Sequence, residues 1–195
     1  MSKEVVIIDY GAGNIQSIQF ALDRLGCKSV LSHDKTEINN AERVIFPGVG
    51  HAKSAMQKLK ETGLQKVIPQ LEQPVLGICL GMQLMCKSTE EGPTEGLGIF
   101  DVDVKHFKID KKVPHMGWNL IKNLKSELFA DLPQETYMYF VHSYFVLQNN
   151  DSIADTDYGF EFCSALQKNN FYGVQFHPEK SGAWGEQILK NFLNL

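Results

Sequence analysis

A cysteine flanked by small residues stands where a strand pattern changes to a helix pattern. The segment Gly77-Ile78-Cys79-Leu80-Gly81 overlaps the apolar run Pro74–Ile78 and precedes the helix-like Met82–Met85. This is the nucleophile-elbow arrangement with cysteine in place of serine, because the tight turn requires small residues two positions before and after the nucleophile. The start of the following helix favours the thiolate, the reactive form of cysteine. For this segment alone, a buried structural cysteine is the alternative.

A second motif, His177-Pro178-Glu179, follows the strand-like run Tyr172–Phe176. In an extended segment residues i and i+2 point to the same side, and the proline biases His177 toward extended geometry. Glu179 can then orient the imidazole through one ring nitrogen while the other faces a thiol. A strand-end turn with a solvated carboxylate is the alternative for this motif alone. Together with Cys79, the motif favours a nucleophile–base–orienter triad.

An acyl-transfer site also needs hydrogen-bond donors for the oxyanion. The loop Pro47-Gly48-Val49-Gly50 follows the strand-like Arg43–Phe46 and precedes a helix. Its glycines free backbone N–H groups for close approach to a substrate oxygen. We expect the N–H groups of Val49 and Leu80 to be the two donors. By itself, this loop could equally be an ordinary turn between a strand and a helix.

The spacing of apolar residues predicts the elements that hold these motifs. In the first half of the chain, short apolar strands alternate with helical patterns, which is typical of a parallel sheet covered on both faces. The predicted strands of this half are Val5–Ile8, Lys28–Leu31, Arg43–Phe46 and Pro74–Ile78. The predicted helices are the pattern from Ile15 to Leu25, Ala52–Lys60, Leu64–Leu71 and the one that Met82–Met85 begins.

In the second half, strand-like runs follow one another with turns between them. They are Gly98–Phe107, Tyr137–Leu147, Phe160–Leu166 and Phe171–Phe176, and Gln187–Leu195 is a predicted closing helix. This order indicates an antiparallel extension of the sheet. We therefore predict one α/β domain over residues 1–195, with a flavodoxin-like mixed sheet that is mostly parallel and has helices on both faces.

Composition excludes several classes of function. The net charge of −4 argues against a nucleic-acid-binding face, which usually carries a basic excess. None of the four cysteines forms a C-x-x-C pair and the histidines lack metal-ligand spacing, so no metal site is expected. The glycines of Asp9–Asn14 fail the G-x-G-x-x-G pattern, since Gln16 stands where the last glycine is needed. Without a visible signal peptide or an apolar run of about 20 residues, we expect a cytoplasmic protein that does not enter membranes.

Together these motifs resemble the class I (triad) glutamine amidotransferases. Three further stretches, Asp9–Asn14, Pro114–Asn119 and Tyr139–Tyr144, make the chain similar to the glutaminase subunits of imidazole glycerol phosphate synthase. The similarity extends from Val5 to the last helix. It implies hydrolysis of glutamine through a cysteine thioester, with no metal or organic cofactor. It also implies a heterodimer in which ammonia passes through a channel to a (β/α)₈-barrel cyclase subunit, for histidine biosynthesis.

The same resemblance implies individual roles. Cys79 is the nucleophile, His177 acts as base and then acid, and Glu179 orients His177. The positions expected to hold glutamine are Gly48, Gly50, Gln83, Ser143 and Tyr144. The positions expected to face the cyclase are Asn14, Met116, Trp118, Tyr139 and Lys180.

Three other functions remain possible at this stage. The chain could be the glutaminase subunit of another synthase, such as anthranilate synthase, with the same chemistry and a different acceptor. It could be a cysteine peptidase on a flavodoxin-like sheet, or a non-enzymatic adaptor on the same fold. The intact triad speaks against the adaptor, which has no need of all three residues.

Overall fold

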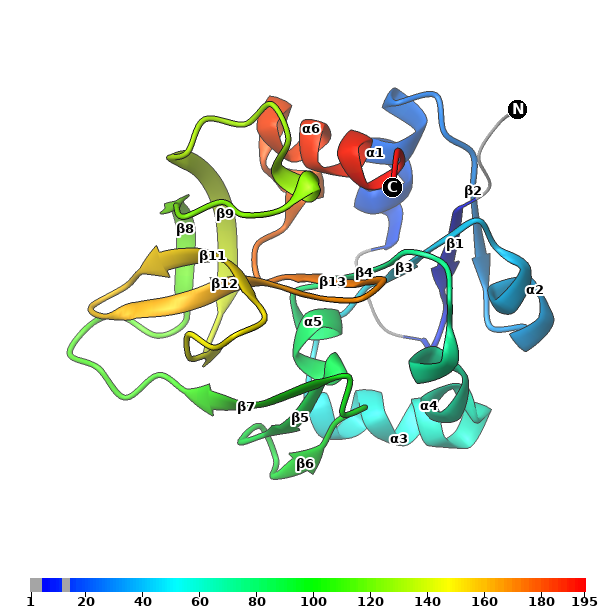
Figure 1. Cartoon of the computed structure of the whole chain (residues 1–195). Helices are drawn as coiled ribbons and strands as arrows, with labels where there is room; N and C mark the ends of the chain where they lie inside the picture. The colour runs from blue at the N-terminus through cyan, green and yellow to red at the C-terminus, as the bar shows by residue number, and fades with distance from the viewer. Residues whose placement is uncertain (1–4, 12–14) are drawn as a thin grey trace.

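A twisted sheet runs through the whole molecule in the computed structural model, which describes residues 5–11 and 15–195 (Figure 1). Eleven strands of the described residues belong to it. In spatial order they are β2 (Ser29–Ser32), β1 (Val5–Ile8), β3 (Arg43–Phe46), β4 (Val75–Ile78), β13 (Phe171–Val174), β12 (Glu161–Lys168), β10 (Tyr144–Val146), β7 (Phe100–His106), β5 (Cys86–Thr89) and β6 (Thr94–Glu95), with β11 (Ser152–Asp157) paired to β12.

The first five strands in this order, β2 to β13, are parallel, and β12, β10 and β7 continue the sheet in antiparallel pairs. The predicted mixed fold is therefore confirmed. One expectation about the second half was wrong, because β13 is a parallel neighbour of β4, with Gly173 opposite Gly77 and Val174 opposite Ile78. The carboxyl ends of these two strands consequently meet at one edge of the sheet, and both triad motifs follow them.

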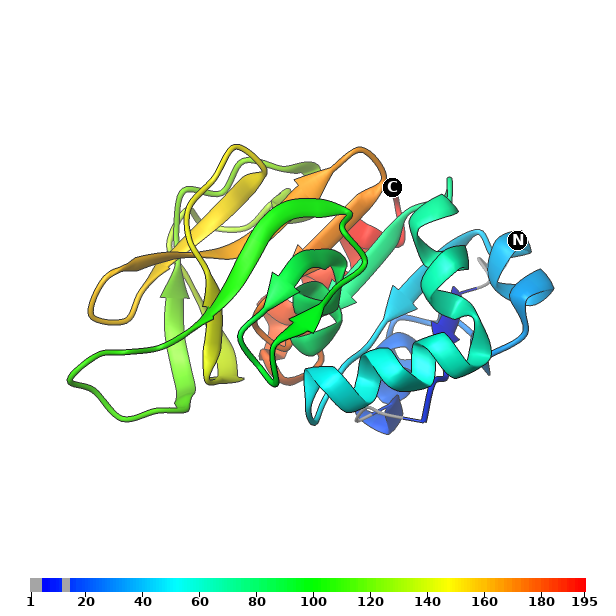
Figure 2. The same cartoon turned by 90° about the horizontal axis from the view of Figure 1, so that it is seen from below.

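Helices cover both faces of the parallel strands (Figures 1 and 2). Alternate residues of β1 divide between the two faces, as strand geometry requires. Val5 and Ile7 join an apolar cluster with α1 (Ile15–Arg24) and α6 (Gly182–Phe192). Val6 and Ile8 join the opposite cluster. The helices of that second face are α2 (Lys35–Asn40), α3 (Ala52–Thr62), α4 (Leu64–Val67) and α5 (Leu80–Met85), and a short 3₁₀ turn, Ile68–Gln70, follows α4.

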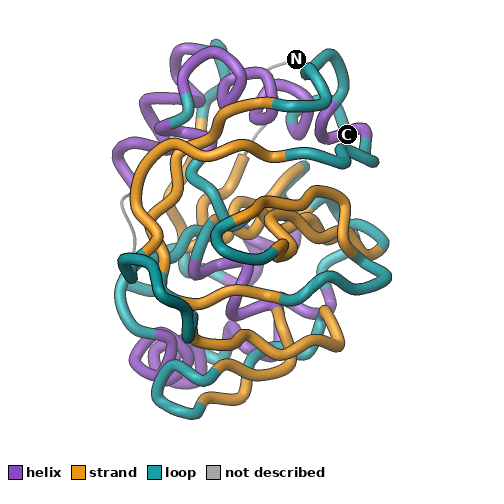
Figure 3. The backbone as a smooth tube through the Cα atoms, turned by 90° about the vertical axis from the view of Figure 1, so that its left-hand side faces the viewer, coloured by secondary structure: helices purple, strands orange, loops and turns teal. Residues whose placement is uncertain are grey.

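A separate two-stranded sheet stands at the end of the molecule away from β1 (Figure 1), the end that faces the viewer in Figure 3. It pairs β8 (His115–Ile121) with β9 (Thr136–His142) in antiparallel register. The prediction of a single strand over Tyr137–Leu147 was wrong, because the strand is interrupted at Ser143. The part before Ser143, β9, belongs to this small sheet, and the part after it, β10, belongs to the large sheet. The strand β8 was not predicted.

None of the helices within residues 5–11 and 15–195 has the length and apolar composition needed to cross a bilayer.

Candidate active site

Cys79 occupies a strained turn between β4 and α5. Its backbone angles are φ 54° and ψ −112°, a region that residues other than glycine avoid. Such strain is typical of a nucleophile held at a sharp strand-to-helix turn. The two glycines of the motif are required by space, because a Cβ on Gly81 would lie 2.0 Å from the carbonyl oxygen of Phe46, and one on Gly77 would lie 2.9 Å from the amide nitrogen of Met82.

The elbow geometry predicts a large effect of Gly81→Ala on stability. The added methyl group meets backbone rather than a movable side chain, so we expect the free energy of unfolding to fall by about 3 kcal/mol or more. Gly26→Ala is the matched control, since Gly26 has φ +70° and open space around its Cβ, and backbone strain alone costs about 1–2 kcal/mol. Urea unfolding of both variants measures the difference. Equal losses would contradict the packing argument.

His177 and Glu179 lie together directly after β13. His177 precedes the 3₁₀ turn Pro178–Lys180, and its Nδ1 is 2.8 Å from the Glu179 Oε1 atom, with both side chains buried. The other ring nitrogen, Nε2, is buried and has no partner of ordinary hydrogen-bond geometry among the described residues. Catalytic hydrogen bonds often tighten only when substrate binds.

The charge state of His177 follows from its neighbours. Burial alone would lower the pKa of this imidazole, but its interactions with the Cys79 sulfur and the Glu179 carboxylate outweigh burial and raise the pKa to about 10. The ring therefore carries a proton at neutral pH. A protonated imidazole between a thiol and a carboxylate can donate a proton to a leaving group.

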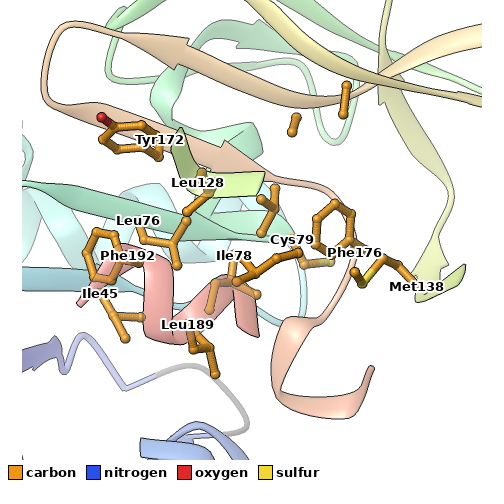
Figure 4. Close-up of a cluster of buried hydrophobic side chains, with 14 of the residues drawn as sticks. Ile45, Leu76, Ile78, Cys79, Leu128, Met138, Tyr172, Phe176, Leu189 and Phe192 are labelled. Atoms are coloured by element: carbon orange, nitrogen blue, oxygen red, sulfur yellow. The ribbon is translucent and has the colours of Figure 1, made fainter. Parts of the chain in front are cut away.

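A cavity of about 290 Å³ opens over the triad. The predicted site residues that line it are Val49, Gly50, Cys79, Leu80, Gln83, Ser143, Tyr144, His177 and Lys180. Gly48 lies beside them against the elbow, where a Cβ would be 2.4 Å from the Gly81 amide nitrogen. Val49 and Leu80, the two predicted oxyanion donors, both line this cavity. Figure 4 shows the other side of Cys79, which lies among apolar side chains that include Ile78 and Phe176.

The residues predicted to face a partner divide into two groups. Met116 and Trp118 lie on β8 and are 54% and 55% exposed, away from the cavity. Tyr139 lies opposite Trp118 on β9, and Lys180 lines the cavity itself. Asn14 lies outside the described residues.

One direct hydrogen bond and one bridge through the Ser181 hydroxyl connect β9 to the backbone of the triad histidine. The amide of His177 donates to the carbonyl oxygen of Tyr139 (2.9 Å), and the amide of Tyr139 donates to the Ser181 hydroxyl (2.9 Å). That hydroxyl donates in turn to the His177 carbonyl oxygen (2.6 Å). The exposed β8–β9 sheet is therefore tied directly to the triad.

Sequence reasoning missed two buried polar residues beside the triad, Gln175 and His142, and three further cavity-lining residues, Glu91, Pro114 and Val141. Both ring nitrogens of His142 have hydrogen-bond partners, and the residue also lines the cavity. Gln175 interrupts an apolar strand end between Val174 and Phe176, and that interruption is a signal that could have found it. Because side chains alternate between the two sides of an extended segment, Gln175 points to the same side as His177.

His142 forms a buried pair with His115 whose tautomers are fixed by their partners. The Nδ1–H group of His142 donates to the Tyr144 carbonyl oxygen (2.7 Å), so its Nε2 must accept from the His115 Nδ1–H group (2.9 Å). The His115 Nε2 then accepts from the Asn119 amide (3.2 Å). Burial lowers the pKa of His115 to about 4 and that of His142 to about 3, so both rings are neutral.

This pair predicts a specific acid sensitivity. Both pKa values lie below the ordinary 6.5, so protons bind the unfolded chain in preference to the folded one. The contribution of the neutral rings to the free energy of unfolding is therefore complete above about pH 6.5. It is lost as the pH falls toward 4 and 3. His177, with its raised pKa, contributes no slope in this window. His142→Gln should therefore flatten the fall in unfolding free energy between pH 6.5 and 4. Urea unfolding across this range tests it, with the exposed His33→Gln as control; identical slopes for His142→Gln and the wild-type chain would contradict it.

The family comparison agrees with this geometry. The family model for glutamine amidotransferase class-I matches residues 6–195. The chain belongs to the class I glutamine amidotransferase family. A relative from Bacteroides fragilis named imidazole glycerol phosphate synthase subunit HisH is 55% identical over 98% of this chain and 100% of its own length. A relative of the same name from Yersinia pseudotuberculosis is 46% identical over the same shares of both chains.

Solved structures support the fold of this amidotransferase. One, described as a glutamine amidotransferase, has a TM-score of 0.76 at 16% identity and covers 97% of each chain. Another, PurLQS from Thermotoga maritima, has a TM-score of 0.76 at 16% identity and covers 100% of this chain and 99% of its own. At such identities the likeness concerns the fold alone, and it matches the mixed sheet with helices on both faces.

Proposed function

We propose that this amidotransferase is the glutaminase subunit of imidazole glycerol phosphate synthase, which hydrolyses glutamine and delivers ammonia to a (β/α)₈-barrel cyclase in histidine biosynthesis. The observation that carries the proposal is the full-length match, at 55% identity, to a relative named as HisH. The cavity over Cys79 and His177 supports the chemistry, since it holds a nucleophile, a proton carrier and oxyanion donors within one space.

In the first half of the reaction, the Cys79 thiolate attacks the side-chain amide carbon of glutamine. The N–H groups of Val49 and Leu80 stabilise the oxyanion that forms. As the intermediate collapses, the C–N bond breaks and the His177 Nε2–H group protonates the departing nitrogen. The products are ammonia, a γ-glutamyl thioester and a neutral imidazole whose Nδ1–H group still donates to Glu179.

In the second half, the neutral Nε2 atom of His177 removes a proton from water, and the resulting hydroxide attacks the thioester carbonyl. Collapse of this intermediate breaks the C–S bond, releases glutamate and restores the Cys79 thiolate beside the imidazolium. Glu179 stabilises the imidazolium in both halves and keeps the ring oriented.

The surface of β8 and β9 is the docking face in this proposal. Met116, Trp118 and Tyr137 expose large apolar area there, and such clustered exposure marks interaction sites. Lys180 lies at the cavity end of the same region, next to Glu179. A partner seated here would contact the sheet whose strand β9 is bonded to the His177 backbone.

Reconstitution tests the proposal. The chain is mixed with the cyclase subunit of imidazole glycerol phosphate synthase from Bacteroides fragilis, and glutamine-dependent formation of imidazole glycerol phosphate is measured. We expect a 1:1 complex and synthesis that depends on both subunits. Glutamine hydrolysis without complex formation or product would point to another synthase, and cleavage of peptides without a partner would point to a peptidase.

A further inference from the structure

Gln175 is a completely buried amide in contact with the catalytic sulfur. Its side chain has no exposed surface, and its Nε2 atom lies 3.7 Å from the Cys79 Sγ atom, within the range of an N–H···S hydrogen bond. It directly follows β13 and stands two residues before His177, so both side chains approach the sulfur from the carboxyl end of that strand. None of the mechanistic steps above uses it.

The orientation of this amide is determined by a chain of hydrogen bonds that begins at the backbone. The carbonyl oxygen of Tyr144 can only accept, so the Gln83 atom 3.1 Å from it must be the nitrogen Nε2. The same nitrogen lies 2.8 Å from the Gln175 amide, and it therefore faces the oxygen Oε1 of that amide. The NH₂ group of Gln175 must then point at Cys79.

We propose that Gln175 stabilises the Cys79 thiolate by donating an N–H hydrogen bond to its sulfur, and that Gln83 holds Gln175 in the donating orientation. The inference rests on the proposed function insofar as Cys79 is the nucleophile. A hydrogen bond from a neutral amide to an ionised acceptor favours the ionised form. This hydrogen bond reaches the sulfur from the end of β13, and the imidazolium of His177 stabilises the same negative charge.

The opposing contact at the sulfur explains why such a donor is needed. The Cys79 Sγ atom also lies 3.8 Å from the carbonyl oxygen of Val141, which favours the neutral thiol as a donor and faces a thiolate unfavourably. The N–H group of Gln175 presents the positive end of its dipole to the sulfur and so offsets the unfavourable effect of the Val141 carbonyl oxygen on a thiolate.

The arrangement also restricts how Gln83 can hold glutamine. Both hydrogens of the Gln83 amide are committed, one to Tyr144 and one to Gln175. Its contribution to a substrate is then its oxygen, which accepts from an N–H donor of glutamine. Gln83 would thus position the Cys79–Gln175 contact and bind substrate with a single amide group.

The test measures the reactivity of the thiol and needs neither glutamine nor a partner. Iodoacetamide alkylation of Cys79 in the free chain is followed by mass spectrometry between pH 5 and 10. In Gln175→Met, which keeps side-chain length and removes the donor, we expect the rate at pH 7 to fall about 10-fold, because a hydrogen bond to a charged group has been lost. The midpoint of the pH profile should move to higher pH, while the plateau rate at high pH stays the same.

Two further variants show whether Gln175 acts as a hydrogen-bond donor or only fills space. Gln175→Glu keeps the shape and can still accept from Gln83, but it places a carboxylate at the sulfur, so its midpoint should move further than that of Gln175→Met. Gln167→Met is the matched control, since the amide of Gln167 bonds Ser126 and Tyr172, and its profile should equal that of the wild-type chain. Unchanged midpoints in both Gln175 variants would overturn the proposal. Failure of the proposed function would instead appear as a wild-type chain that does not hydrolyse glutamine in the complex.

Discussion

Cys79→Ala should abolish glutamine hydrolysis, with a loss in kcat of at least about 10⁴-fold, yet leave synthesis from ammonium salts by the cyclase complex unchanged. The alanine removes the only atom that forms a covalent bond with substrate in the proposed mechanism. The elbow should persist, because its strain is imposed by the surrounding backbone and the site of Gly81, and alanine is smaller than cysteine. Both activities are measured on the reconstituted complex.

The other buried thiols provide the control. Cys163 is fully buried on β12, and burial raises its pKa to about 12, so it stays a neutral thiol. Cys163→Ala should retain glutamine hydrolysis. Loss of ammonia-dependent synthesis in Cys79→Ala would assign Cys79 a part in assembly, and retained hydrolysis would remove it from the mechanism.

The local parts of this site could be predicted from sequence because local rules determine them. The elbow at Cys79 requires small residues at fixed offsets, and the His177–Glu179 pair depends on i, i+2 geometry across a proline. Both were predicted, and the structure brings them into one cavity. The alternation of apolar strands and helices likewise predicted the parallel half of the sheet.

The non-local parts could not be predicted because no local pattern encodes them. The pairing of β13 with β4 joins segments about a hundred residues apart, and periodicity gives no partner for a strand. The contact of Gln175 with Gln83 spans 92 residues, so a buried glutamine could be noticed in sequence but not given its partner. The break at Ser143 is marked in the sequence only by the polar pair His142-Ser143 within an apolar and aromatic run, and two such residues are too weak a turn signal to end a strand.

The second large effect concerns control by the partner. Docking of the cyclase with its nucleotide ligand should raise kcat for glutamine hydrolysis by about 10²–10³-fold over the free chain, which is the contribution of one oxyanion donor. The Val49 N–H group is the donor that can change, because Val49 is 39% exposed on a loop, whereas Leu80 is buried in α5. This N–H group belongs to the peptide between Gly48 and Val49, so its reorientation changes ψ at Gly48 and φ at Val49. The neighbouring Gly50, which has open space around its Cβ position, lets the rest of the loop follow.

Gly50 makes this rotation testable. Its φ of +100° belongs to a region that an alanine avoids, and no atom lies within 4 Å of its Cβ position, so Gly50→Ala changes the backbone preference without a steric clash. Reorientation of the Val49 N–H moves the backbone that leads into residue 50, so the loop can follow only if residue 50 keeps its full range of φ, and alanine removes the positive part of that range. The ratio of kcat in the liganded complex to kcat in the free chain should therefore fall toward 1, whichever orientation donates to the oxyanion. Kinetics on the free chain, the complex and the liganded complex measure it.

Gly98→Ala, at another positive-φ glycine with open space, should keep the wild-type ratio. An unchanged ratio in Gly50→Ala would place the activation elsewhere, at the hydrogen bonds that join β9 to the His177 backbone.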